Sequence, residues 1–78
     1  MINSKGETSM ERTPVTSSNV CSIGYDIDSQ ILEVEFNNGA VYQYSGVPEY
    51  EYIGLMDSDS KGARMHSHIK NQYPCTKL

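Results

Sequence analysis

Five residues in the last third of the chain have the chemistry of an anion-binding site. A helix is expected to begin at Ser60, Lys61 and Gly62, where free backbone amides and the helix dipole attract anions. Arg64 follows Lys61 at a three-residue spacing that places both cations on one helix face, and Lys70 lies further along the segment. These residues predict a contact with phosphate groups. The alternative is structural: Ser60 caps the helix, Gly62 allows close packing, and the cations offset nearby carboxylates.

Charge is sorted along the sequence in a way that favours such a contact. Every charged side chain from Ser17 to Asp59 is acidic, and every one from Ser60 to the end is basic. The net charge of −4 therefore hides a bipolar molecule. A small cationic face could meet a nucleic-acid backbone or an acidic protein, whereas the overall acidity disfavours indiscriminate binding to nucleic acid.

Tyrosines are the second group of residues with binding chemistry, and the chain has six. One interpretation is a tyrosine-rich core whose hydroxyl groups reach the edges of the domain. The other is that one or two rings stay exposed and stack on bases or on peptide side chains. The candidates for stacking are Tyr42, Tyr44 and Tyr73.

Metal and catalytic chemistry find little support in the sequence. A calcium loop starting at Asp57 fails because Lys61 replaces an oxygen ligand and His68 replaces the bidentate carboxylate. His66 and His68 point about 200° apart on a helix, so they cannot chelate one ion. The cysteines and serines show no catalytic spacing or nucleophile elbow. We expect no catalytic residue, no metal and no cofactor, and an enzyme is the least favoured class.

Length and composition predict one small domain. A chain of 78 residues buries only roughly 60% of its unfolded surface, so a second copy of the chain is one means of stabilisation. Cys21 and Cys75 are expected to be reduced, one of them in the core, with a disulfide between them less favoured. No apolar stretch approaches the roughly 20 residues that span a bilayer, and no secretory signal is evident. We expect a cytoplasmic protein without membrane contact.

The pattern of apolar residues predicts an α+β domain over residues 17–78, preceded by a disordered leader over residues 1–16. Alternation predicts a strand from Val20 to Tyr25 and a second from Leu32 to Phe36, with Glu33 and Glu35 on its wet face. Asn37-Asn38-Gly39 predicts a hairpin that leads into a third strand over residues 41–45.

Two helices are expected after the strands. Val47-Pro48-Glu49 favours the start of the first helix, and the second is expected from about Lys61 to Gln72, before Pro74. The predicted fold is a three-stranded antiparallel β-meander followed by two short helices packed on one face, in the order β-β-β-α-α.

Several phrases, taken in order, give the chain a likeness to a known family. They are Ser17-Ser18-Asn19-Val20, Ser22-Ile23-Gly24-Tyr25-Asp26, Leu32-Glu33-Val34-Glu35-Phe36, Gly39 through Tyr42-Gln43-Tyr44, Val47-Pro48, Ser60-Lys61-Gly62 and Ile69-Lys70 with Tyr73. Together they resemble the KTSC domain, which occurs at the C-terminus of some lysyl-tRNA synthetases and as small bacterial and phage proteins. The resemblance covers Ser17 to about Tyr73. The resemblance implies a nucleic-acid-binding appendage, and it implies no established activity. Ala63-Arg64-Met65 stands where such domains often carry an aromatic residue.

Two functions are favoured over an enzyme. The first is a small non-enzymatic module that binds RNA, tRNA or other single-stranded nucleic acid through its basic second helix. Few cations would make that binding weak and salt-sensitive, so a homodimer or larger assembly would strengthen it. The second is a protein-interaction module of a phage or mobile element, whose protein partner docks on the acidic sheet face or on an unpaired strand edge.

Overall fold

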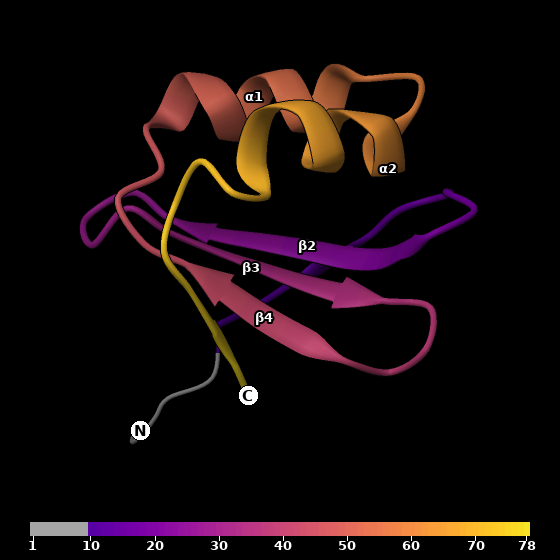
Figure 1. Cartoon of the computed structure of the whole chain (residues 1–78), viewed down its shortest axis with the longest axis horizontal. Coiled ribbons are helices and arrows are strands. Elements are labelled where there is room, and N and C mark those ends of the chain that lie inside the picture. Colours follow the sequence, from indigo (N-terminus) through magenta and orange to yellow (C-terminus); the bar gives the residue numbers. More distant parts are fainter. Residues whose placement is uncertain (1–9) are drawn as a thin grey trace.

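The computed structural model describes residues 10–78 as an antiparallel sheet with helices on one face (Figure 1). The sheet has five strands in the order β1-β2-β3-β4-β5. Their bounds are β1 Thr13–Pro14, β2 Val20–Asp26, β3 Ile31–Phe36, β4 Val41–Tyr44 and β5 Cys75–Lys77. The helices are α1 Glu49–Asp57, α2 Lys61–Arg64 and the π-helix η2 Met65–Ile69, which continues α2 without a break. The predicted α+β class is confirmed.

The predicted meander forms the centre of the sheet. β2 pairs with β3 in the register Ile23↔Val34, and β3 pairs with β4 in the register Leu32↔Tyr44. The hairpin between β3 and β4 turns through Gly39, whose φ of 90° suits a residue without a Cβ. Alternation therefore grouped the buried side chains of Ile23, Leu32 and Val34. It also placed Cys21 with Ile23, and Cys21 is exposed.

Two further strands extend the predicted three. β1 pairs with β2 in the register Thr13↔Ile23, and β5 pairs with β4 in the register Tyr44↔Cys75. Both strands are short and all their side chains are exposed, so neither carries the alternation that reveals a half-buried strand. β1 also lies inside the predicted leader over residues 1–16. Residues 10–16 of that leader belong to the folded domain, and residues 1–9 lie outside the described residues.

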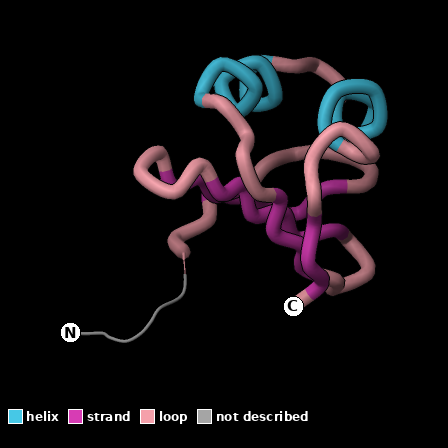
Figure 2. The backbone as a smooth tube through the Cα atoms, turned by 60° about the vertical axis from the view of Figure 1, so that its left-hand side comes forward, coloured by secondary structure: helices cyan, strands magenta, loops and turns pink. Residues whose placement is uncertain are grey.

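The core lies between the sheet and the helices, which Figure 2 shows together on one side of the strands. Its fully buried members are supplied by strands, by the loop before α1 and by both helical segments: Val20, Ile23, Leu32, Val34, Val47, Leu55, Met65 and Ile69. Tyr25 and Tyr52 stack at one end of this layer with ring centroids 4.8 Å apart. The Tyr25 hydroxyl donates a hydrogen bond to the carbonyl oxygen of Val47. Among residues 10–78 no helix has the length and apolar character to cross a membrane.

The opposite sheet face corrects the expectation of a wet acidic surface. Glu33 is only 2% exposed because the segment before β1 crosses this face. Arg12 forms an ion pair with Glu33 and donates a hydrogen bond of 3.0 Å to Ser22 Oγ. Gln43 Nε2 donates to Glu33 Oε1 at 2.9 Å, and Ser22 Oγ donates to Glu35 Oε1 at 2.9 Å. A polar network therefore occupies the centre of this face.

The second helix is shorter than predicted and partly π-helical. The Lys70 amide donates to the Met65 carbonyl at 2.7 Å, and the backbone becomes extended at Lys70. Asn71 has a φ of 68°, a left-handed conformation that ends the helix before the predicted limit at Gln72. Ser60 occupies the N-cap position without a side-chain cap, so its predicted capping role is wrong. The Ser60 amide donates instead to Ser58 Oγ at 3.2 Å.

Both cysteines are exposed, which corrects the expectation that one belongs to the core. Cys21 and Cys75 are also free thiols. The β2–β3 register shifts between Val20 and Ser22, and this bulge turns the intervening Cys21 outward. Cys75 is exposed because it lies on the edge strand β5.

Candidate functional site

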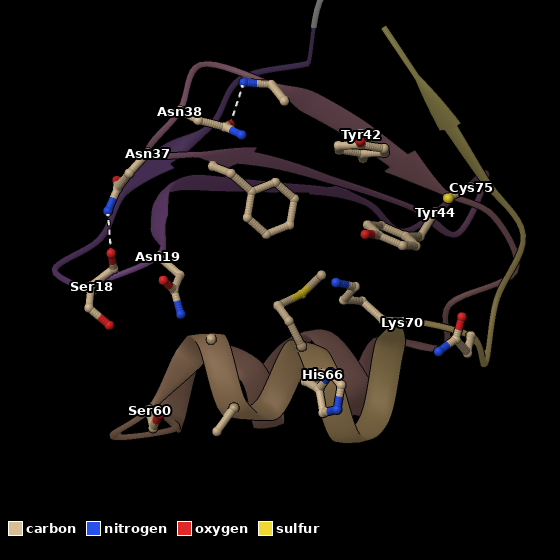
Figure 3. A pocket seen from close by; sticks show the side chains of 16 residues that line it. Ser18, Asn19, Asn37, Asn38, Tyr42, Tyr44, Ser60, His66, Lys70 and Cys75 are labelled. Atoms are coloured by element: carbon tan, nitrogen blue, oxygen red, sulfur yellow. Dashed lines mark hydrogen bonds between the residues drawn. The ribbon is translucent and has the colours of Figure 1, made fainter.

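A groove of about 1000 Å³ opens between the helix-facing side of the sheet and the segment α2–η2 (Figure 3). Its floor is aromatic and comes from β3 and β4: Phe36, Tyr42 and Tyr44. Its opposite wall comes from α2 and η2 and includes Gly62, Ala63, Met65 and His66. The volume is at the upper end of the range of about 300–1,000 Å³ that is usual for small-molecule sites.

The aromatic floor is a packed row with part of its surface accessible. Phe36 meets Tyr42 edge-to-face with ring centroids 5.7 Å apart, and Tyr42 and Tyr44 lie 6.5 Å apart. Tyr44 is only 3% exposed, so its ring belongs mainly to the core. Burial raises the pKa of its hydroxyl, with smaller contributions from Cys75 and Tyr42. Phe36 and Tyr42 are half-buried and offer the accessible ring surface.

The π-helix positions two basic side chains along the groove. Met65 and Ile69 are buried and fix one face of η2 against the core. His66 and Lys70 follow them by one residue, are exposed, and line the groove together. Figure 3 shows Lys70 extending between the helix and Tyr44. π-Helical turns often occur at functional sites, where they change the direction of side chains.

One end of the groove is lined by neutral polar groups. Asn37 Nδ2 donates to the Ser18 carbonyl at 2.8 Å, and the Ala40 amide donates to Asn38 Oδ1 at 3.0 Å. Asn19 lies directly against Gly62, where an added Cβ would stand 2.6 Å from Asn19 Nδ2. The glycine therefore allows β2 and α2 to approach at this end.

The other end is cationic. Lys70 lines it together with Cys75. In the β4–β5 ladder Tyr42 pairs with Lys77 and Tyr44 with Cys75, and cross-strand partners project to the same face of a sheet. Lys77 therefore stands on the groove side of the sheet, next to the aromatic floor.

The residues predicted from sequence are divided between two places. Those that line the groove are Ser60, Gly62, Lys70, Tyr42 and Tyr44. Lys61, Arg64 and Tyr73 lie elsewhere. Lys61 Nζ donates to the Ser58 carbonyl at 2.9 Å, so its ammonium group closes the loop between the helices.

Arg64 and Tyr73 converge on Glu51 of α1. Arg64 Nη2 lies 3.7 Å from Glu51 Oε1, and the Tyr73 hydroxyl lies 3.4 Å from Glu51 Oε2. His68 Nδ1 is 3.9 Å from the same carboxylate, on the side of η2 away from His66. Burial and the Glu51 carboxylate raise the pKa of Tyr73. For Arg64 this placement supports internal neutralisation, the alternative weighed from the sequence.

Sequence reasoning missed several groove residues: Asn19, Phe36, Asn37, Asn38 and His66. It also missed Lys77, the cross-strand partner of Tyr42. Phe36 carried a usable signal because it shares the alternation of Leu32 and Val34. Asn37 and Asn38 were predicted only as part of the hairpin turn. Within residues 10–78 no group of three or more His, Cys, Asp or Glu side chains is placed to hold a metal ion.

Comparison with known proteins agrees with this architecture. The KTSC domain model matches residues 16–73, nearly the whole described chain. The chain belongs to the KTSC family. The KTSC fold is also seen in the crystal structure of a KTSC domain protein from Yersinia pestis, which is 44% identical. The two structures superpose with a TM-score of 0.84 over 90% of this chain and 99% of that chain.

Two relatives show the KTSC domain alone and within a larger protein. A protein of Stutzerimonas stutzeri is 42% identical over 64 residues, covering 82% of this chain and 90% of its own length. A lysine–tRNA ligase of a Nostoc species is 35% identical over 54 residues, covering 69% of this chain and 10% of the ligase. The KTSC domain therefore occurs both as most of a small protein and as a minor part of a ligase.

Proposed function

We propose that this KTSC domain is a small non-enzymatic module that binds single-stranded nucleic acid, with RNA as the favoured class, in the groove between sheet and second helix. The observation that carries the proposal is the accessible aromatic surface of Phe36 and Tyr42 facing a wall with Lys70 and His66. Bases stack on aromatic side chains of many single-strand-binding modules, while cations follow the phosphate backbone.

The charge distribution supports a weak interaction that depends on salt. Lys70 lines the groove and Lys77 pairs with Tyr42 across the β4–β5 ladder, while the chain as a whole carries a net charge of −4. Each phosphate contact contributes counterion release, so two or three contacts give a small salt slope. A second domain or a second copy would raise the apparent affinity by holding the strand at two points.

The lysine–tRNA ligase relative supports RNA as the ligand class. In that protein the matching segment is a minor part of an enzyme whose substrate is a tRNA. A weak RNA-binding appendage would add affinity for the same tRNA without taking part in catalysis. In this chain the same stacking and phosphate contacts would bind a different RNA, either free or carried by a partner.

The five residues of the anion site predicted from the sequence have different roles in this binding mode. Ser60, Gly62 and Lys70 keep a place beside the ligand because they line the groove. Lys61 and Arg64 act in the packing of the helices, since their charged groups already contact Ser58 and Glu51.

Fluorescence anisotropy with a short labelled single-stranded RNA tests the proposal. We expect Lys70→Ala to weaken binding and to lower the salt slope by about 1, and Tyr42→Ala to weaken it without changing the slope. Lys61→Ala is the charge-matched control, because it removes a lysine outside the groove. Equal loss in Lys61→Ala and Lys70→Ala would place the interaction outside the groove, and absence of binding at low salt would reject the proposal.

A protein-interaction module, of a phage or another mobile element, is the second candidate. Arg12 covers the centre of the acidic sheet face, which disfavours this face as the docking site. Exposed apolar residues on α1 favour a different position: Tyr50 is 70% exposed and Ile53 is 50% exposed. Capture from a host extract, with and without nuclease, separates the candidates. A protein retained after nuclease treatment and lost with Ile53→Asp supports this second function.

A further inference from the structure

We infer that the groove is oriented: Asn38 reads the edge of one base at its neutral end, and Lys70 and Lys77 hold phosphate at its cationic end. The inference rests on the proposed function and adds a base preference to it, for uracil over cytosine.

The two ends differ in chemistry, and the aromatic floor lies between them. Figure 3 shows Asn19 and Asn38 at one end of the groove, Lys70 and Cys75 at the other, and Tyr42 on the floor near the cationic end. A cation at one end attracts the phosphate that precedes or follows a stacked base. The base then points its hydrogen-bonding edge toward the neutral end, which asparagine and serine side chains line.

The orientation of the Asn38 amide is fixed by the backbone. The Ala40 amide can only donate, so the group that it meets at 3.0 Å is the carbonyl oxygen Oδ1 of Asn38. The other half of the side chain, the Nδ2 amino group, is therefore the part left for a ligand. Figure 3 shows this nitrogen on the groove side of Oδ1. Asn38 thus presents a hydrogen-bond donor to the groove.

A fixed donor distinguishes between the pyrimidines. Uracil carries a carbonyl acceptor at position 4, as thymine does, whereas cytosine carries an amino donor there. With position 4 of the base facing Asn38, its donor can bond the uracil carbonyl, but in cytosine it meets a second donor at that position and both groups are left unpaired. The two bases have the same ring size, so the aromatic floor does not discriminate strongly between them. The predicted preference is about fivefold, the effect of one net hydrogen bond.

Lysines 70 and 77 have the complementary role. Their ammonium groups contact phosphate, which positions the strand and carries no base information. Removing either cation is therefore expected to weaken the binding of uracil and cytosine oligomers by the same factor. A variant that changes the ratio of the two dissociation constants has lost base recognition, the role of Asn38. A variant that raises both constants equally has lost a phosphate contact, the role of the lysines.

The test compares labelled oligouridylate and oligocytidylate of equal length, bound to the full chain and to three variants. In the unaltered chain we expect the dissociation constant for oligocytidylate to be about five times that for oligouridylate. In Asn38→Ala this ratio should fall to about one. It should invert in Asn38→Asp, because a carboxylate still accepts from the Ala40 amide and also accepts from the cytosine amino group. Lys77→Ala should keep the ratio and lower the salt slope. Circular dichroism of each variant verifies that the hairpin and sheet are retained.

The outcomes separate the inference from the proposed function. Binding of both oligomers with a ratio of one in the unaltered chain overturns the inference and leaves the proposed function standing. A uracil preference that survives Asn38→Ala also overturns it, because another group then reads the base. Failure of both oligomers to bind at low salt overturns the proposed function itself.

Discussion

Tyr42 and Lys77 are direct partners across the β4–β5 ladder, so the last cation of the chain stands beside the aromatic floor of the groove. β5 also closes the sheet at β4, with the Ser45 amide donating to the Pro74 carbonyl and the Leu78 amide to the Val41 carbonyl, at 2.9 and 2.8 Å. The C-terminal strand therefore contributes both to the groove and to the protection of an edge.

Removal of residues 75–78 should lower stability and expose β4 as an edge. The deletion breaks the ladder beside Tyr42 and Tyr44, and we expect a loss of about 1–3 kcal/mol, the usual range for a defined structural defect. An uncovered strand with aromatic side chains also promotes association. Urea unfolding measures the first effect, and sedimentation velocity measures the second. An unchanged midpoint would show that β5 adds no stability.

Arg12→Met should destabilise the domain through the buried carboxylate on the outer sheet face. The Glu33 side chain is 3% exposed and the Arg12 side chain 28% exposed, so removal of the cation leaves a charge inside the polar network. The expected loss is about 2–3 kcal/mol, below the roughly 3–5 kcal/mol of a fully buried pair because Arg12 is partly exposed. Urea unfolding at neutral pH measures it. Arg12→Met combined with Glu33→Gln should recover much of the loss.

Arg64→Met should cost less than Arg12→Met. The Arg64 side chain is 32% exposed and lies 3.7 Å from Glu51, so solvent screens the pair, and we expect about 0.5–1 kcal/mol. The same variant should leave RNA affinity at the level of Lys61→Met, its charge-matched control. If Arg64→Met weakened RNA binding far more than Lys61→Met while remaining folded, the anion site predicted from the sequence would be supported after all.

Stability should decline at alkaline pH because of the buried tyrosine. Burial raises the folded-state pKa of Tyr44, so the ionised form favours the unfolded chain. The stabilising contribution is complete below the ordinary tyrosine pKa of 10.0 and is lost as the pH rises through the raised folded-state pKa. The midpoint temperature of thermal unfolding should fall less steeply with rising pH in Tyr44→Phe than in the unaltered chain. Tyr50→Phe, at a 70% exposed position, is the matched control and should leave the decline unchanged.

The central elements were accessible from local sequence. Leu32 and Val34 alternate with Glu33 and Glu35, and Asn38-Gly39 marks a hairpin, because strand periodicity and turn conformation depend on neighbouring residues. Pro48 and the acidic residues after it located the start of α1 for the same reason. Charge sorting also indicated where cations gather along the chain, although not which of them meet solvent.

Tertiary structure decided the candidate site. Lys61 and Lys70 are similar residues in the sequence, but Lys61 is held by the Ser58 carbonyl and Lys70 lines the groove. Tyr42 and Lys77 are far apart along the chain and become neighbours only through the β4–β5 register. Local sequence was enough to predict the three central strands, the hairpin and the distribution of charge, since these follow from short-range preferences. Which cations are neutralised, and which stand beside aromatic rings, was decided by packing between distant segments, because electrostatic contacts depend on distances that only the folded chain defines.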